Sequence, residues 1–365
     1  MTPADRRWMA AALSIGRRGR GRCAPNPAVG CVIVGDGRVV GRGRTADGGR
    51  PHAETVALAQ AGEAARGATA YVTLEPCSHH GRTPPCADAL VAAGIARCVV
   101  ALSDPDPRVA GQGIERMRAA GIAVTTGVGE DEARRDHAPF LLRITEGRPR
   151  VTLKLALSLD GRIATASGES RWITGPEARR HVHAMRLAHD AVMVGAGTAR
   201  ADDPDLTVRG MGNVRQPVRV VLSRRLDLDP ASRLGRSARE VPVWLLHGAS
   251  APEAQREAWA ATGARLAEVP GPRGSVMPMD AVLRALGDGG LNSVLVEGGG
   301  SLAAGLLSAN LVDEVAAFTA GLALGAEGRP GIGALGLHDL AEAHRFRLAD
   351  ARAVGSDVLH RWVRE

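Results

Sequence analysis

Short apolar runs alternate with Ala-rich, helix-like segments along most of the chain, and this alternation restricts the folds it can adopt. Strands separated by helices are typical of βα units, in which helices cover the faces of a sheet. Aromatic residues make up only 2% of the sequence, so the cores must be built mainly from Ala, Val, Leu and Ile. The pattern predicts the α/β class. In the first half the alternating segments are Val29–Val34, Glu54–Ala64, Ala70–Leu74, Ala87–Ala92, Cys98–Leu102 and Ile114–Ala119.

The length of 365 residues exceeds what one hydrophobic core usually holds, so we expect two domains. Residues 146–150 combine charge with Gly and Pro directly before a fresh apolar run, Val151–Leu157, and this break predicts domains 1–147 and 148–365. Residues 229–275 are richer in Gly, Pro, Ser and Arg, and we expect looser connections there. The further strands predicted in the second half are Val192–Val194, Val218–Leu222, Val241–Leu246, Ser293–Val296 and Glu314–Thr319.

The net charge of +7 raises the question of nucleic acid, because clustered basic residues neutralise phosphates. Here the positive charge is dispersed. Single-strand binders also use aromatic side chains as stacking platforms, and the chain offers little beyond Trp8, Tyr71 and Trp172. Small phosphorylated ligands account for the excess of Arg better than nucleic acid does.

The cysteine pattern and the N-terminal segment predict a cytoplasmic protein. Five cysteines without framework spacing favour reduced thiols, with Cys23, Cys31 and Cys98 scattered along the chain. The first residues predict an amphipathic helix, Trp8–Ile15, without the apolar stretch and cleavage site of a secretory signal. No stretch approaches the length needed to span a bilayer, so no membrane contact is expected.

Three potential metal ligands are split between two segments. His52 is followed by Glu54, and Cys77 and Cys86 flank a Ser-His-His-Gly-Arg-Thr-Pro-Pro insert. One His and two Cys can hold zinc, and three protein ligands leave a tetrahedral zinc one open position for water, as in catalytic sites. A carboxylate two residues from the first ligand can carry protons without occupying the metal, and we assign Glu54 to that task.

Two other interpretations of these residues remain. A closed structural zinc site would need a fourth ligand, for which His79 and His80 are the obvious candidates. Alternatively, the His and the two Cys are unconnected core and surface residues. The catalytic interpretation is favoured because His52 and Cys86 stand where helices are predicted to begin, and free N–H groups there favour thiolate. We expect His79 and His80 to shape the substrate pocket or its loop.

The segment from Thr73 to Cys86 closely resembles the bacterial riboflavin-biosynthesis deaminase–reductase family. It differs from the general zinc deaminase signature, because eight residues rather than two separate Cys77 from Cys86. Upstream, residues 25–31, Pro-Asn-Pro-Ala-Val-Gly-Cys, resemble the family's substrate loop. The resemblance implies a cytidine-deaminase-like three-layer αβα domain with one zinc ion, and it implies that Asn26 contacts the pyrimidine.

Lys154 is the only lysine in the chain, and its surroundings are informative. Chance is one explanation, but Lys and Arg differ in proton chemistry, and a lone Lys among so many Arg is conspicuous. Residues 154–162, Lys-Leu-Ala-Leu-Ser-Leu-Asp-Gly-Arg, resemble the opening strand of the same family's reductase domain, which is dihydrofolate-reductase-like. Further matching segments together cover most of residues 151–210: 167–174, 197–198, 201–204 and 206–209.

A glycine run at residues 298–300 follows a buried-type strand and precedes a predicted helix, Leu302–Leu307. Exposed N–H groups at such a turn can hold phosphate. A Rossmann site is rejected, because an acidic partner about 20 residues further on is absent and the turn lies near the end of the chain. The glycines could also serve packing alone.

The resemblance implies ligand contacts by position. The Arg186 and Arg209 pair is expected to hold the substrate's phosphate, and Ser223 with Arg224 to bind the 2′-phosphate of NADPH. The NADPH contacts fall on Ala156, Trp172, Thr198, Asp202, Ser223, Gly299, Gly300 and Ser301. The substrate contacts fall on Ser170, Arg186, Leu206, Arg209 and Glu297.

The resemblance thus implies a bifunctional enzyme of riboflavin biosynthesis. The first domain would remove the C2 amine of a diaminopyrimidinone ribosyl phosphate, and the second would reduce the ribosyl group to ribityl with NADPH. Lys154 and Glu297 would polarise and protonate the reduced centre. A homo-oligomer is expected. One alternative is a nucleic-acid deaminase, but this sequence lacks the short Cys-x-x-Cys loop and the stacking aromatic residues of that class. The other alternative is a zinc-stabilised NADP-binding regulator.

Overall fold

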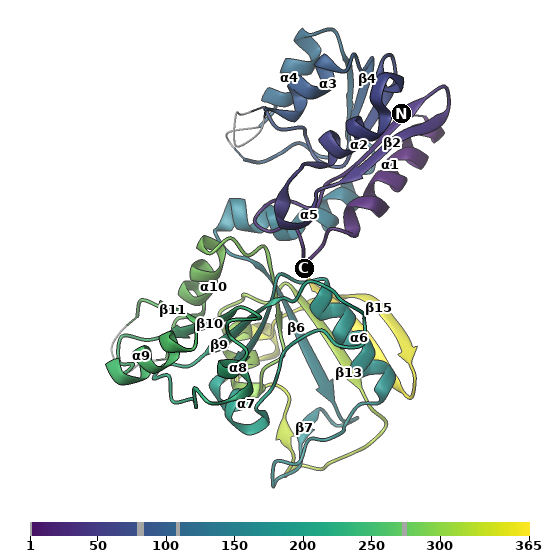
Figure 1. The fold of residues 1–365 in the computed structure, drawn as a ribbon. Coiled ribbons are helices and arrows are strands. Elements are labelled where there is room, and N and C mark those ends of the chain that lie inside the picture. The colour runs from purple at the N-terminus through teal and green to yellow at the C-terminus, as the bar shows by residue number, and fades with distance from the viewer. Residues whose placement is uncertain (1, 79–83, 107–109, 272–275) are drawn as a thin grey trace. The chain divides into compact units, whose positions relative to one another are not determined.

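The computed structural model describes residues 2–78, 84–106, 110–271 and 276–365. The chain divides into two compact units, Met1–Gly147 and Arg148–Glu365, each with its own sheet (Figure 1). His79 and His80, the candidates for a fourth zinc ligand, lie outside the described residues. Within the described ranges, no helix is both long and apolar enough to cross a membrane.

The first unit is built on a five-stranded sheet of order β2-β1-β3-β4-β5. The strand β1 pairs antiparallel with β2 and β3, whereas β3, β4 and β5 run parallel. The carboxyl ends of the three parallel strands therefore meet at one edge, where α/β proteins place their ligands. The strands are β1 (Gly30–Gly35), β2 (Arg38–Arg44), β3 (Thr69–Val72), β4 (Arg97–Val100) and β5 (Ala123–Thr126).

Helices cover both faces of this sheet, and two glycines show how closely. A Cβ on Gly30 of β1 would lie 1.9 Å from the carbonyl oxygen of Ala12 in α1 (Pro3–Arg17). A Cβ on Gly41 of β2, whose side chain would share the opposite face, would lie 2.2 Å from the carbonyl oxygen of Ala57 in α2 (Ala53–Ala61). Only glycine permits these approaches.

The remaining helices complete the two layers. The helix α5 (Glu130–Glu146) packs on α1, and α3 (Cys86–Ala92) packs on both α2 and α4 (Gln112–Ala119). Short 3₁₀ turns, η1 (Asp47–Gly49) and η2 (Gly62–Ala65), flank α2. The predicted three-layer αβα architecture is confirmed.

The second unit carries a nine-stranded sheet of order β11-β10-β9-β8-β12-β6-β13-β16-β15. All pairs from β11 to β13 are parallel, and the hairpin β15–β16 adds an antiparallel edge. The strands are β6 (Arg150–Leu157), β8 (Ala191–Gly195), β9 (Val218–Leu222), β10 (Val243–His247), β11 (Arg265–Glu268), β12 (Ser293–Val296), β13 (Glu314–Thr319), β15 (Phe346–Val354) and β16 (Asp357–Arg364).

Both faces of this large sheet are buried. Along β8, Ala191 and Met193 belong to one apolar cluster and Val192 and Val194 to another, as the alternation of side chains along a strand requires. A separate two-stranded ribbon pairs β7 (Arg162–Ala164) with β14 (Arg329–Pro330). The helices are α6 (Pro176–Leu187), α7 (Ala196–Asp202), α8 (Arg233–Arg236), α9 (Glu253–Ala261), α10 (Met279–Asp288), α11 (Gly300–Ser308) and the 3₁₀ turn η3 (Leu340–Glu342).

The expectation of loose connections over residues 229–275 is wrong for the described part of that range. It contains α8, β10, α9 and β11, and Trp259 on α9 is fully buried. The Gly and Pro residues there mark turns between short elements, and the apolar positions between them, such as Val243 and Leu245, bury their side chains in the sheet.

Candidate active sites

The three predicted zinc ligands converge in the first unit. His52 is the N-cap of α2, Cys77 follows β3, and Cys86 is the first residue of α3. Their ligand atoms all lie within 4.8 Å of one another. Nδ1 of His52 faces both sulfurs, 3.7 Å from Sγ of Cys77 and 3.4 Å from Sγ of Cys86. One imidazole nitrogen and two thiols are a donor set that suits zinc, so the residues present fit the metal.

The surroundings of the cluster favour a thiolate at Cys77. A hydrogen bond with the Cys86 thiol, followed by one with His52 and one with the backbone N–H of Cys86, lowers the pKa of Cys77 to about 4. That backbone N–H lies 3.3 Å from Sγ of Cys77. The same hydrogen bond with Cys77, together with burial, raises the pKa of Cys86, and the one between Cys77 and His52 raises the pKa of His52. A thiolate is the form of Cys that binds metal.

Glu54 lies in the first turn of α2, two residues from His52, with only 4% of its surface exposed. Burial, followed by the charge on Cys77, raises the pKa of Glu54 to about 7. A carboxyl group that titrates near neutrality can both accept and return a proton, which is what a general acid–base group needs.

Asn26, predicted to contact the pyrimidine, lies directly beside this cluster. Its Nδ2 donates to the carbonyl oxygen of Gly49 at 2.7 Å and lies 3.2 Å from Nε2 of His52. The predicted substrate loop therefore borders the metal ligands on the side away from the sulfurs.

Glu75 is a residue of this region that sequence reasoning missed. Its carboxylate accepts four backbone N–H groups, from Asp104, Gly111, Gly113 and Ile114, at 3.0 to 3.3 Å. It thereby ties the segment after β4 and the start of α4 to the strand end that carries Cys77. The one signal in the sequence was an acidic residue between an apolar strand and a metal ligand.

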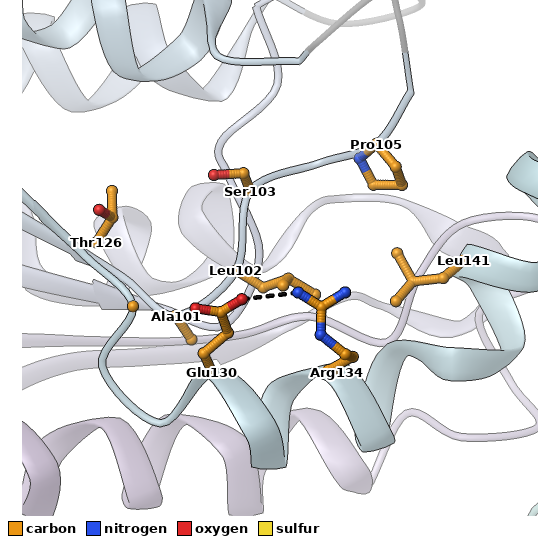
Figure 2. A pocket seen from close by; sticks show the side chains of 9 residues that line it. Ala101, Leu102, Ser103, Pro105, Thr126, Glu130, Arg134 and Leu141 are labelled. Carbon is orange, nitrogen blue, oxygen red and sulfur yellow. Dashed lines mark hydrogen bonds and ion pairs between the residues drawn. The ribbon is translucent and has the colours of Figure 1, made fainter. Parts of the chain in front are cut away.

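A pocket of about 200 Å³ opens at the carboxyl ends of β4 and β5 (Figure 2). Its cationic side chain, Arg134, is paired at 2.7 Å with Glu130, one turn earlier on α5. The pocket contains none of the predicted site residues; its lining is Ala101, Leu102, Ser103, Pro105, Thr126, Gly127, Glu130, Arg134 and Leu141.

The second unit contains a group of three charged side chains: Lys154 on β6, Glu297 after β12 and Arg186 on α6. Nε and Nη2 of Arg186 donate to the two carboxylate oxygens of Glu297 at 2.6 and 2.9 Å, and the side chains are 12% and 8% exposed. Burial raises the pKa of Glu297, but Arg186 and then Lys154 outweigh this effect and lower the pKa. Burial and the charge of Arg186 lower the pKa of Lys154, against the effect of Glu297. A Lys with a lowered pKa is suited to proton transfer.

The two arginines predicted to hold phosphate have different surroundings. Arg186 also donates to the carbonyl oxygen of Thr207 at 2.8 Å, so three of its N–H groups are already bonded. Arg209 is 59% exposed and pairs with Asp205. Leu206 is buried in the apolar core with φ of 54°, so its backbone rather than its side chain could face a substrate. Ser170 is half-buried in the loop before α6.

The predicted NADPH residues partly come together. Gly299 N–H donates to Thr198 Oγ1 at 3.2 Å, which joins the turn before α11 to α7. A Cβ on Gly197 would meet nothing within 4 Å, and on Gly299 only Thr198 Oγ1 at 3.7 Å, so open space borders this turn. Because N–H groups also begin α11 here, the turn fits a phosphate-bearing cofactor.

The other glycines of the run also permit close packing. A Cβ on Gly298 would lie 3.0 Å from the backbone nitrogen of Gly195, and on Gly300 it would lie 2.7 Å from the carbonyl oxygen of Pro330. Ser223 is buried, and its hydroxyl donates to Asp227 at 2.8 Å. The remaining predicted contacts border solvent to different degrees: Ala156 is half-buried, Asp202 and Ser301 are exposed, and Trp172 is 68% exposed beneath the guanidinium of Arg179.

Two family models match the two units separately. The model of the cytidine and deoxycytidylate deaminase zinc-binding region matches residues 2–102, and the RibD C-terminal domain matches residues 149–360. A zinc-binding deaminase unit followed by a reductase unit defines the class of protein as a bifunctional deaminase and reductase.

Relatives match across nearly the whole length. The chain is 45% identical to the riboflavin biosynthesis protein RibD of Escherichia coli, over 97% of this chain and 98% of that protein. The solved structure of Acinetobacter baumannii RibD, form 2, is 40% identical with a TM-score of 0.88, covering 99% of both chains. A deaminase/reductase structure from Thermotoga maritima is 34% identical with a TM-score of 0.86 and covers 99% of both.

The chain belongs to the RibD family of riboflavin biosynthesis. The family resemblance and the bifunctional deaminase and reductase activities predicted from sequence are thereby confirmed, as are zinc and NADPH as cofactors.

Proposed function

We propose that residues 1–147 deaminate a diaminopyrimidinone ribosyl phosphate at C2 and that residues 148–365 reduce the product's ribosyl group to ribityl. The Thermotoga maritima relative is named for these two activities, which act on phosphoribosylamino pyrimidines. The observation that carries the proposal is the convergence of His52, Cys77 and Cys86 beside the buried Glu54. The cytoplasm, where phosphorylated intermediates are made, is the proposed location.

In the deaminase unit, His52, Cys77 and Cys86 would hold zinc, which when bound supplies activation of water for attack on C2. Glu54 takes the proton from the attacking water and delivers protons to the ring nitrogen and to the departing amine, so that water and substrate give the C2 carbonyl and ammonia. Asn26, beside His52, orients the pyrimidine ring against this carboxyl group.

In the reductase unit, the turn at Gly299–Ser301 with Thr198 would hold NADPH, which when bound supplies a hydride. The hydride reduces C1′ of the ring-opened sugar imine, and one proton must reach the nitrogen. Lys154 supplies this proton, and the Glu297 carboxylate, which Arg186 holds in place and keeps ionised, polarises the same centre. Ser170, Leu206 and Arg209 border the substrate.

The deaminase assignment is tested with Glu54→Gln, compared with Glu63→Gln at an exposed position of the same unit. Glu54→Gln should lower ammonia release by about 10²–10⁴-fold, the usual contribution of a general acid–base group. Bound zinc, and NADPH oxidation with substrate that has already been deaminated, should be unchanged. Glu63→Gln should change none of these. Ammonia release that persists in Glu54→Gln would refute the proton-carrying role.

The reductase assignment is tested with Lys154→Ala on substrate that has already been deaminated. We expect NADPH oxidation to fall by about 10²–10⁴-fold while ammonia release from the diamino substrate stays unchanged. A zinc chelator should give the converse pattern, abolishing ammonia release and sparing NADPH oxidation. Unchanged reduction in Lys154→Ala would remove Lys154 from the mechanism.

A further inference from the structure

His183 lies on α6 three residues before Arg186, so the two side chains leave the same face of the helix. Nδ1 of His183 lies 3.2 Å from the backbone nitrogen of Arg209, whose N–H donates to it. One turn along, Arg186 holds both Glu297 and the carbonyl oxygen of Thr207. His183 therefore faces the proposed substrate site of the reductase.

The hydrogen bond from Arg209 determines which ring nitrogen of His183 carries a hydrogen. Because Nδ1 accepts from an N–H group, the neutral ring has its hydrogen on Nε2. Burial and then the charges of Arg186 and Arg209 lower the pKa of His183, with Glu297 and the carbonyl of Thr207 opposing them. The ring is thus a neutral donor near neutral pH.

The Nε2–H group is available to a ligand. It forms no hydrogen bond with any residue in the described part of the chain. Nε2 is also absent from the set of buried side-chain atoms without a partner there, so it is open to solvent. The charges that act on the ring are unequal: those of Arg186 and Arg209 are opposed by the single carboxylate of Glu297. An uncommitted donor beside an excess of positive charge suits an anion.

We propose that Nε2–H of His183 binds the phosphate of the ribosylamino pyrimidine substrate, while Nδ1 anchors the loop that carries Leu206 and Arg209. This inference rests on the proposed reductase activity and adds a substrate-binding residue to it. A hydrogen bond made equally in the ground state and the transition state changes KM and leaves kcat unaltered.

Two substitutions separate the functions of the two ring nitrogens. In His183→Asn the side-chain oxygen can still accept from Arg209 N–H, but the distal donor is lost. In His183→Gln the longer amide places an N–H near the position of Nε2, but the acceptor at Nδ1 is lost. We expect His183→Asn to raise KM for the phosphorylated, deaminated substrate about ten-fold with kcat unchanged, and His183→Gln to restore most of the loss.

The same assay with a substrate lacking the phosphate tests the ligand group, since His183→Asn should have no effect there. His181→Asn is the matched control, because His181 on the same helix contacts the ring of Phe318 instead, at 5.6 Å between centroids. NADPH oxidation at saturating substrate reports that the second unit of each variant is folded, and ammonia release reports the same for the first unit.

Binding of ribose 5-phosphate, measured by calorimetry, makes the test independent of turnover. Weaker binding to His183→Asn than to the unsubstituted chain or to His181→Asn supports the phosphate contact even if no reduction is observed, in which case the proposed function alone fails. Equal binding, or an equal rise in KM with both the phosphorylated and the unphosphorylated substrate, overturns the contact.

Discussion

Replacing Glu75 with Gln would remove a buried carboxylate that holds four backbone N–H groups. Oε1 accepts from Gly113 and Ile114 at 3.0 and 3.3 Å, and Oε2 accepts from Gly111 and Asp104 at 3.1 and 3.2 Å. Glu75 is 4% exposed, so water cannot readily replace these bonds. The substitution keeps the size of the side chain and changes only its hydrogen-bonding capacity.

The magnitude follows from the number of donors left without an acceptor. The single amide oxygen of Gln can serve one pair of N–H groups, while its own NH₂ group faces the other pair. Each buried donor without a partner costs about 1–3 kcal/mol, and partial movement of the segment toward water reduces the total for two donors to about 2–4 kcal/mol. Because about 1.4 kcal/mol corresponds to a factor of ten, local opening should become about 30- to 700-fold more frequent.

Hydrogen exchange of the full-length chain, followed by mass spectrometry, measures this opening directly. In Glu75→Gln the amides of Asp104, Gly111, Gly113 and Ile114 should exchange faster by that factor, whereas peptides of α6 in the second unit should be unchanged. Glu63→Gln is the control, since that carboxyl is exposed. Exchange at the four amides that matches the unsubstituted chain would refute the claim that Glu75 holds this segment.

Three further predictions concern charged and titratable groups. Arg186→Gln leaves the Glu297 carboxylate without its bidentate partner and should lower reductase kcat/KM about 10- to 100-fold with ammonia release unchanged. Asp5→Asn breaks the ion pair with Arg97, whose side chain is 31% exposed, and should destabilise the first unit by about 1–3 kcal/mol. Urea unfolding monitored by hydrogen exchange measures this change in the free energy of unfolding. Arg97 depresses the pKa of Asp5, so this stabilisation is present above about pH 4 and should disappear as the pH falls further. Burial and then Arg20 lower the pKa of His137 to about 4, so the unfolded chain binds an extra proton between about pH 4 and 6.5. As the pH falls from 6.5 to 4, the free energy of unfolding of the first unit should therefore decrease by about 1.4 kcal/mol per pH unit, and His137→Gln should lessen this decrease.

The zinc cluster was predictable because its chemistry is local. His52 and Glu54 are two residues apart, and the ligand types themselves select zinc. The partners of Glu75 lie about 30 to 40 residues further along the chain, and the burial that makes its four hydrogen bonds valuable is created by tertiary packing. For His183, the sequence showed only that it stands three residues before Arg186, a spacing of about one helical turn. That spacing becomes informative once the structure places the N–H of Arg209 against the His183 ring.

Gly and Pro misled the sequence analysis wherever they serve packing instead of breaking an element. The strand β2, Arg38–Arg44, was not predicted, since Gly41 and Gly43 interrupt its apolar pattern. Those two glycines are required, because a Cβ on either would lie within 2.4 Å of a carbonyl oxygen of α2. The helix α5 was missed for a similar reason: Pro139 lies within it, although Ala133, His137 and Phe140 bury one face at helical spacing.

The same packing explains how the deaminase site is held in place. Because α2 lies close against β2 at Gly41 and Gly43, the start of this helix is fixed against the sheet, and with it His52 at the N-cap and Glu54 in the first turn. Cys77 is fixed from the other side by the end of β3 and by the N–H of Cys86. Gly41 and Gly43, which bind no metal themselves, therefore help to determine the geometry of the site, and a family motif confined to the ligands does not contain them.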